Sequence, residues 1–388
     1  MKQSKLLLPM IILILSGLLL NACSYSVQVL STPGSVAPVA TQTMIVPTPA
    51  QTEAPVTLVT PTVTPTLIPI RVDKLNMLKI FESFKLGDVV RSVAFTPDGT
   101  TLAAAGGNTD NVAVQLWDVA SGQIVSILGE HHDIVWDVAF SPDGRLLASV
   151  SSDGTAQVYD WRTGDVEKIL NFPRQVVSVS FSPDGQTMAV GGVDTSPNAS
   201  VWIYAVGSWS QLFKLPEFIN ITAMAYSPKS AVIIGGGTSR NVQVWRTDTG
   251  ASVFTLSHAH QVSKAVISPD GSTVATGSCA TETNGNCTEG AVWLWDLPTG
   301  KLLRKLGGFS TMVDNLTYLA DGTALIVASR DGTLRVYNTS NIVSGYSPVL
   351  DIAVPGGISA LAVSPDGTLL ATGNDNGDVN IWRVVDLP

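Results

Sequence analysis

The stretch "FSPDG" occurs at Phe140–Gly144 and again at Phe181–Gly185, with the variants "FTPDG" at Phe95–Gly99 and "VSPDG" at Val363–Gly367. Proline presets the backbone for the first corner position of a tight turn, and Asp-Gly tolerates the positive φ that follows. One such stretch predicts only a turn between two strands. Its recurrence predicts a hairpin corner that the chain builds repeatedly.

The corners recur with a nearly fixed period. Aligning the corner prolines places one unit every 41 to 51 residues, at Pro97, Pro142, Pro183, Pro228, Pro269, Ala320 (in "LADG") and Pro365. A second signature, an apolar run ending in Trp or Tyr, follows each corner, as in "VQLWD" ending at Asp118 and "VWLWD" ending at Asp296. A period in the forties, with short alternating apolar runs and no amphipathic helical stretch, predicts an all-β propeller.

The two signatures together resemble those of the WD-repeat (WD40) propeller family, over roughly residues 78–388. Two units keep the Trp-Asp pair, Trp117-Asp118 and Trp295-Asp296, and Tyr, Arg or Asn substitutes elsewhere. The Gly-His dipeptide of eukaryotic members is missing, but His131, His132, His258 and His260 lie in the matching loops. The resemblance implies seven blades, and a structural hydrogen-bonding role for at least one of these histidines. It does not identify a partner.

The seventh unit ends at "VNIWRVVDLP" and lacks a fourth strand, whereas "LKIFESFKLG" at Leu78–Gly87 precedes the first unit and has the composition of an outer strand. Closing the ring removes exposed sheet edges that would otherwise favour aggregation. We therefore predict an all-β fold: a seven-bladed β-propeller of four-stranded antiparallel blades, closed by an N-terminal strand in the last blade.

The chain begins with two lysines and an uncharged apolar run that leads to Cys23, "MKQSKLLLPMIILILSGLLLNAC". This pattern predicts a secretory signal over residues 1–22. "LNAC" resembles the lipobox of bacterial lipoproteins, which implies a diacylated Cys23 and a membrane contact through this lipid anchor alone. An ordinary cleaved signal followed by a chance cysteine is the alternative.

A Thr- and Pro-rich segment follows, and we assign residues 23–74 to the lipidated cysteine and a tether, and residues 75–388 to the propeller. Frequent prolines block helix and sheet hydrogen bonds, so the tether is expected to be extended and to reach on the order of 140 Å at about 3.1 Å per residue. The expected location is extracytoplasmic, at the cell membrane or at an outer membrane where there is one.

The chain has 22 Lys and Arg against 31 Asp and Glu, which gives a net charge of -9. Such a surface repels phosphate backbones, so we expect no nucleic-acid partner. We also expect a monomer.

Cys279 and Cys287 lie eight residues apart and predict a disulfide in an exported protein. A metal site is the alternative, but it lacks further Cys or His ligands at suitable spacing.

Three units carry extra residues between their second and third strands, at 106–111, 193–200 and 279–287. The resemblance places these loops on the face that also carries the loops between blades; neutral drift is the alternative reading.

By alignment, the residues entering the inner strands on that face are Arg91, Trp136, Asp137, Thr222, Lys264, Asp314 and Ser359. A mixture of Trp, Arg and Asp is typical of interaction hot spots. The candidate partner-binding residues are Arg91, Trp136, Asp137, Lys264 and Asp314. Packing of Trp136 between blades is the alternative.

No catalytic motif is found: there is no nucleophile elbow, zinc-protease helix, phosphate loop or Cys-His pairing. The run "NDNGD" at Asn374–Asp378 resembles the start of a calcium loop but lacks the closing Glu, and it falls where a tight hairpin is expected. We assign no catalytic, cofactor or metal residues and predict a membrane-anchored, non-enzymatic scaffold that binds a protein through its loop face. An assembly factor for an envelope complex differs only in its partner. The alternative is a propeller that binds or hydrolyses a small ligand in its central channel.

Overall fold

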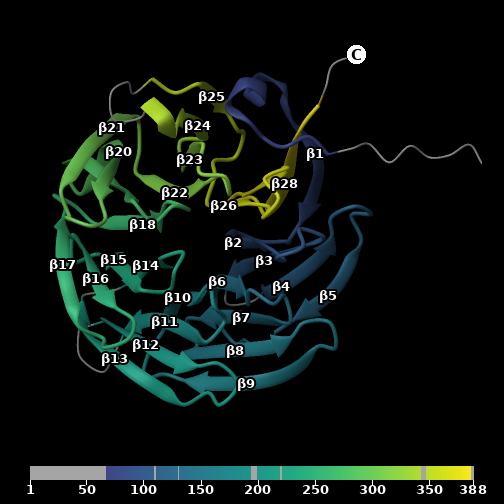
Figure 1. The fold of residues 1–388 in the computed structure, drawn as a ribbon. Coiled ribbons are helices and arrows are strands. Elements are labelled where there is room, and N and C mark those ends of the chain that lie inside the picture. Colours follow the sequence, from purple (N-terminus) through teal and green to yellow (C-terminus); the bar gives the residue numbers. More distant parts are fainter. Residues whose placement is uncertain are drawn as a thin grey trace, which may run out of the picture. The chain divides into compact units, whose positions relative to one another are not determined.

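The computed structural model describes residues 67–108, 111–129, 131–193, 199–218, 221–341 and 347–385. In this part of the chain, seven four-stranded antiparallel sheets are arranged as blades around a central axis (Figure 1). The predicted signal peptide, Cys23 and the tether up to residue 66 lie outside the described residues. None of the described helices has the length and apolar character needed to cross a membrane.

The first four blades follow the chain order, each running from an inner strand at the axis to an outer strand at the rim. Blade 1 consists of β2 (Val90–Phe95), β3 (Thr101–Asn108), β4 (Asn111–Asp118) and β5 (Ile124–Leu128). Blade 2 consists of β6 (Val135–Phe140), β7 (Leu146–Ser151), β8 (Thr155–Asp160) and β9 (Asp165–Asn171). Blade 3 consists of β10 (Val176–Phe181), β11 (Thr187–Val193), β12 (Ala199–Ala205) and β13 (Gln211–Phe218). Blade 4 consists of β14 (Ile221–Tyr226), β15 (Val232–Gly237), β16 (Asn241–Arg246) and β17 (Ser252–Ser257).

The remaining blades complete the ring, and the inner strands of blades 1 and 7 lie side by side. Blade 5 consists of β18 (Val262–Ile267), β19 (Thr273–Thr283), β20 (Asn286–Asp296) and β21 (Leu302–Phe309). Blade 6 consists of β22 (Val313–Tyr318), β23 (Ala324–Ser329), β24 (Thr333–Asn338) and β25 (Leu350–Ala353), with a short 3-10 helix η2 (Thr339–Asn341) after β24. Blade 7 consists of β26 (Ala360–Val363), β27 (Leu369–Gly373), β28 (Asp378–Val384) and β1 (Leu78–Lys85).

The N-terminal strand closes the ring, as the sequence predicts. Strand β1 pairs antiparallel with β28 and forms the outer strand of blade 7 (Figure 1). Phe84 of β1 also stacks on Trp117 of blade 1, with ring centroids 5.3 Å apart. The chain packs against the propeller even before this strand, because Ile70 is buried and its amide donates to the carbonyl of Gly367 at 2.8 Å. A 3-10 helix, η1 (Val72–Met77), joins this segment to β1.

The repeated Pro-Asp-Gly stretch forms the corner between the inner strand and the second strand of a blade. In blade 2, the amide of Gly144 donates to the carbonyl of Ser141 at 2.9 Å, and Gly144 has a φ of 69° that a side chain would strain. The Ser141 hydroxyl donates to Asp143 at 2.5 Å, and this bond holds the pKa of Asp143 below its ordinary value. The same hydroxyl-to-carboxylate bond occurs in the corners of blades 1, 3, 5 and 7, at Asp98, Asp184, Asp270 and Asp366.

The hydrophobic core is divided into clusters that lie between neighbouring blades. One cluster joins Val114 and Leu116 of blade 1 to Val135 and Leu147 of blade 2, all buried. Blades also approach closely through glycine: a Cβ on Gly290 of blade 5 would lie 1.9 Å from the carbonyl oxygen of Thr311. Tight packing between neighbours fixes the inner strands around the axis, and this positions the residues at their ends.

Candidate binding site at the channel mouth

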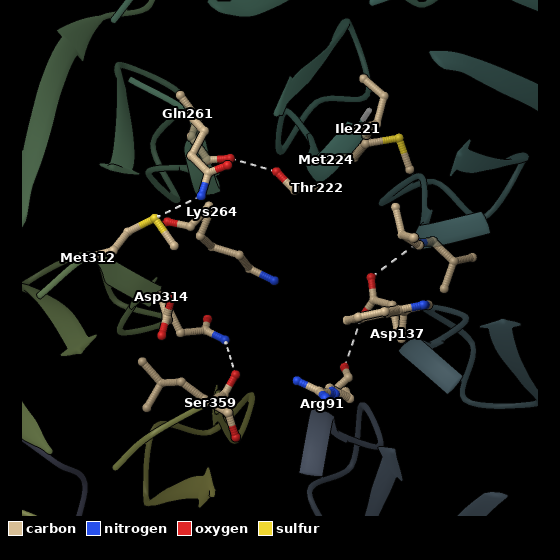
Figure 2. Close-up of a pocket in the computed structure, with 18 of the residues that line it drawn as sticks. Arg91, Asp137, Ile221, Thr222, Met224, Gln261, Lys264, Met312, Asp314 and Ser359 are labelled. Carbon is tan, nitrogen blue, oxygen red and sulfur yellow. Dashed lines mark hydrogen bonds between the residues drawn. The ribbon is translucent and has the colours of Figure 1, made fainter. Parts of the chain in front are cut away.

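A cavity of about 510 Å³ opens where the inner strands begin, around the central axis (Figure 2). All five candidate partner-binding residues line it: Arg91, Trp136, Asp137, Lys264 and Asp314. Thr222 and Ser359, which the alignment placed at the same entry, line it as well. The structure therefore brings together every residue that the sequence grouped at the channel mouth.

These residues occupy two successive positions rather than one. Arg91, Trp136, Thr222 and Asp314 are the second residues of their inner strands, whereas Asp137 and Lys264 are third residues. In six of the inner strands described here, the pairing register shifts at the second position. Such a bulge leaves one residue out of the ladder and changes the direction of its side chain. The bulge is therefore the local feature that turns the second residues toward the mouth, and no sequence motif marked it.

Asp137 uses both carboxylate oxygens to join three blades. Its Oδ1 accepts the hydroxyl of Ser92 in blade 1 at 2.8 Å and the amide of Val138 at 3.0 Å. Its Oδ2 accepts the amide of Val179 in blade 3 at 3.1 Å and the hydroxyl of Ser178 at 3.3 Å. Asp137 thus lines the cavity but is already hydrogen-bonded on both oxygens, which gives it a structural role at the mouth.

Two hydroxyls that the alignment placed at the mouth also join neighbouring blades. Thr222 Oγ1 donates to the carbonyl of Val262 in blade 5 at 2.6 Å. Ser359 Oγ donates to the carbonyl of Val90 in blade 1 at 2.7 Å, across the closure of the ring. Ser263 makes the equivalent bond to Val313 between blades 5 and 6. Small hydroxyl residues at this position therefore hold adjacent inner strands together.

Arg91 and Trp136 form a pair on one wall of the cavity. The guanidinium carbon of Arg91 lies 5.1 Å from the centre of the Trp136 ring, within the range of a cation-π contact. The indole nitrogen of Trp136 donates to the hydroxyl of Ser152 at 2.7 Å, which fixes the ring. Nε of Arg91 is buried and has no hydrogen-bond partner among the described residues. The pair therefore presents an oriented guanidinium at the mouth.

Asp314 and Lys264 stand in different electrostatic environments. Asp314 is mostly buried, and Nε of Arg330 lies 2.9 Å from its Oδ2. Burial raises the pKa of Asp314, although Arg330 acts in the opposite direction. Lys264 is half-buried, and its side chain extends toward the middle of the cavity (Figure 2). Within the described residues, no hydrogen bond or ion pair engages its ammonium group.

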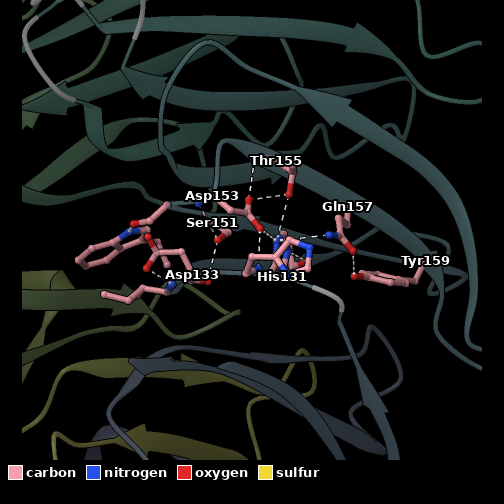
Figure 3. Close-up of polar contacts among 12 residues, drawn as sticks. His131, Asp133, Ser151, Asp153, Thr155, Gln157 and Tyr159 are labelled. Atoms are coloured by element: carbon pink, nitrogen blue, oxygen red, sulfur yellow. Dashed lines mark hydrogen bonds and ion pairs between the residues drawn. The ribbon is translucent and has the colours of Figure 1, made fainter. Parts of the chain in front are cut away.

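The histidine clusters lie away from this cavity, in hydrogen-bonded networks within the blades. His131 is buried; its Nδ1 lies 3.0 Å from Oδ2 of Asp153 and its Nε2 lies 2.8 Å from the hydroxyl of Ser149 (Figure 3). Burial lowers the pKa of His131, against the effect of Asp153. In blade 5, burial lowers the pKa of His258 to about 4. The structural role that the resemblance implied for at least one histidine is thus seen at His131.

The blade 5 network uses the same chemistry with a different set of side chains. Nε2 of His258 lies 2.7 Å from the hydroxyl of Thr276, which also accepts the indole N–H of Trp295 at 3.0 Å. Among the described residues, no cluster of three or more His, Cys, Asp or Glu side chains is placed to hold a metal ion. The "NDNGD" run forms the tight turn predicted for it, in which Oδ1 of Asn374 accepts the amides of Asn376 and Asp378 at 3.0 and 2.9 Å.

The sequence predicts a long loop around Cys279 and Cys287, but the structure has two paired strands there. Strands β19 and β20 have eleven residues each, and their paired ends reach Thr283 and Asn286. The structure contains the Cys279–Cys287 disulfide, which joins the two strands. Nδ1 of His260, in the preceding loop, lies 2.8 Å from Oε2 of Glu282 on this hairpin. The extra residues of blade 5 therefore extend a hairpin. Of the other two loops, residues 109–110 and 194–198 lie outside the described residues.

Comparison with known proteins agrees with this architecture. Five segments match the WD domain, G-beta repeat family, at residues 77–113, 122–160, 167–196, 300–338 and 348–383. Three similar proteins come from Arabidopsis thaliana. "Cell division cycle 20.1, cofactor of APC complex" is 27% identical over 65% of this chain and 55% of its own length. "Periodic tryptophan protein 2" is 26% identical over 65% of this chain and 29% of its own length. "Autophagy-related protein 16" is 23% identical over 76% of this chain and 47% of its own length.

The matched regions thus span about half the length of these relatives, or less. The matched segments begin in the closing strand β1 and end in β28, the strand with which it pairs. The five matched segments, the seven blades and these relatives show that the chain is similar to WD40 β-propellers.

Proposed function

We propose that this chain is a scaffold that binds a protein partner at the channel mouth. The observation that carries the proposal is the cavity of about 510 Å³, in which Lys264 and the Arg91-Trp136 pair are held by rigid inner strands. The Trp136 ring, which Ser152 holds, and the Arg91 guanidinium over it can bind a partner at a low cost in conformational entropy. Segments of this chain match the WD domain, G-beta repeat, and one similar protein is named a cofactor of a complex.

We further propose that the scaffold is exported and held at a membrane surface through a lipid on Cys23. The apolar run before this cysteine and the "LNAC" sequence support the proposal. The Thr- and Pro-rich tether would hold the propeller clear of the membrane, so that the channel mouth is accessible to large partners.

The small-ligand alternative remains a second use of the same cavity. Asp137 accepts hydrogen bonds on both oxygens, whereas Asp314 forms an ion pair with Arg330 but its Oδ2 accepts no hydrogen bond in the described structure. A hydrolytic site would need a carboxylate or another base free to act on a ligand. Asp137 is thereby excluded as such a base, and Asp314 is the lining carboxylate on which the small-ligand alternative depends.

The test is crosslinking and affinity capture from intact cells. We compare the native chain with a variant that carries Arg91→Ala, Trp136→Ala and Lys264→Ala. A control variant carries Arg246→Ala and Lys301→Ala, two exposed positions outside the cavity. The expected result is one partner that the native and control chains enrich and that the cavity variant loses by ten-fold or more. Equal capture by all three, or no enriched partner at all, would overturn the proposal.

A further inference from the structure

The charged groups around the cavity leave an unused positive charge. Its lining includes three cations, Arg91, Lys264 and Arg330, and two carboxylates, Asp137 and Asp314. Asp314 pairs with Arg330, and Asp137 is occupied by donors from three blades. The lining therefore carries one more cation than carboxylate, and Arg91 and Lys264 are its cations without an ion pair in the described structure. Because the whole chain has a net charge of -9, its composition does not account for a cationic cavity.

These two cations line the same cavity from different blades, Arg91 from blade 1 and Lys264 from blade 5. Lys264 is half-buried, reaches into the cavity and has no counterion among the described residues (Figure 2). Arg91 lies against Trp136 and keeps a buried Nε that nothing in the described structure accepts. A buried donor without a partner is unfavourable, and a guanidinium and an ammonium group that line one cavity favour an anion with two acceptor oxygens. A carboxylate meets both requirements.

The rest of the lining indicates what carries the anion. The lining also includes apolar side chains from several blades, among them Val177, Ile221 and Met312. Nε2 of Gln261 has only a long contact, 3.5 Å to the sulfur of Met312, so this amide can turn toward a ligand. Methylene groups that end in a carboxylate fit such a mixed lining better than a fully polar ion does.

We infer that the cavity is a carboxylate subsite, in which Lys264 and Arg91 bind the acidic side chain of a protein partner. This inference rests on the proposed function, because it names the chemistry of the partner at the same mouth. Lys264 contributes a point charge, Arg91 contributes directed hydrogen bonds, and Trp136 fixes the plane of Arg91.

The test measures binding of a labelled, capped peptide of alternating Gly and Glu to the purified full chain. The matched probe replaces every Glu with Gln. We expect the Glu peptide to bind at least ten-fold more tightly than the Gln peptide, because the neutral amide cannot form a charge-assisted hydrogen bond to both cations. Lys264→Gln should weaken Glu-peptide binding at least ten-fold, and Lys264→Arg should retain most of it. The control is Lys301→Gln, an exposed lysine of the same blade, which should change binding less than two-fold.

Equal binding of the two peptides, or equal effects of Lys264→Gln and Lys301→Gln, would overturn the inference. So would binding of inorganic phosphate that depends on Lys264 when the Glu peptide does not bind. The two proposals fail differently. A partner lost on the cavity mutations without any binding of the Glu peptide leaves the scaffold standing and removes the subsite. Binding of the Glu peptide without a captured partner keeps the carboxylate site and removes its assignment to a protein partner.

Discussion

The two ends of each inner strand differ in how closely their residues repeat from blade to blade. At the corner end, Ser or Thr bonds to Asp in blades 1, 2, 3, 5 and 7, and six corners have glycine at the same positive φ of 69° to 74°. At the mouth end, the second residues of the six bulged strands are of six kinds: Arg91, Trp136, Val177, Thr222, Ser263 and Asp314. The repeated end builds the blades, and the varied end makes one mouth of the channel chemically specific.

The largest predicted effect concerns the ring on which both ends depend. Deleting Leu78–Gly87 removes β1 and the buried side chains of Leu78, Phe84 and Leu86. Each such apolar side chain is worth about 2–5 kcal/mol, so we expect loss of the cooperative thermal transition and aggregation. Circular dichroism and light scattering during heating measure both.

The control for this deletion removes ten residues of the predicted tether, 41–50, and should leave the melting temperature unchanged. A closure-deleted chain with the native melting temperature would show that the blades are stable without a closed ring. The corner and mouth ends would then have to be compared blade by blade.

The second prediction separates two neighbours at the mouth. Asp137→Asn disrupts bonds to blades 1 and 3 and should lower the free energy of unfolding by about 2–3 kcal/mol, because hydrogen bonds to charged groups are stronger than neutral ones. Lys264→Gln should change it by less than about 0.5 kcal/mol, since Lys264 makes no contact of this kind in the described structure. Chemical denaturation of both variants tests the pair. Equal destabilisation would mean that Lys264 is also a structural residue.

The sequence predicts the fold well because each blade repeats two local signatures, and the missing fourth strand of the last unit pointed to the N-terminal strand. It also grouped the mouth residues correctly. It did not distinguish Asp137 and Thr222, which tie blades together, from Arg91 and Lys264. That distinction depends on bulges and on donors from neighbouring blades, which no single repeat encodes. The hairpin of Cys279 and Cys287 was mistaken for a loop because its Thr, Asn and Gly residues are typical of loops, although they pair here as strands.

The smallest predicted effect tests the corner that lacks both the Asp and the Gly of the repeat. In blade 4 the corner reads "YSPKS", with Lys229 in place of Asp and Ser230 in place of Gly. Ser230 keeps the turn, since its amide donates to the carbonyl of Ser227 at 2.8 Å, but it does so at a φ of 55°. A side chain in this left-handed region costs about 1–2 kcal/mol, and Lys229 cannot accept the Ser227 hydroxyl.

Restoring the repeat with Lys229→Asp and Ser230→Gly should therefore raise the free energy of unfolding by about 1 kcal/mol. The gain is limited because Ser230 Oγ also accepts the amide of Asp184 at 3.3 Å, and glycine loses this bond. The reciprocal change in blade 2, Asp143→Lys with Gly144→Ser, is the matched control and should destabilise by a similar or larger amount. Chemical denaturation midpoints of the two variants give the answer. If the blade 4 variant is more stable and the blade 2 variant less stable than the native chain, the repeated Asp and Gly residues themselves determine the stability of the turn. If the blade 4 variant is less stable than the native chain, this corner is adapted to Lys229 and Ser230.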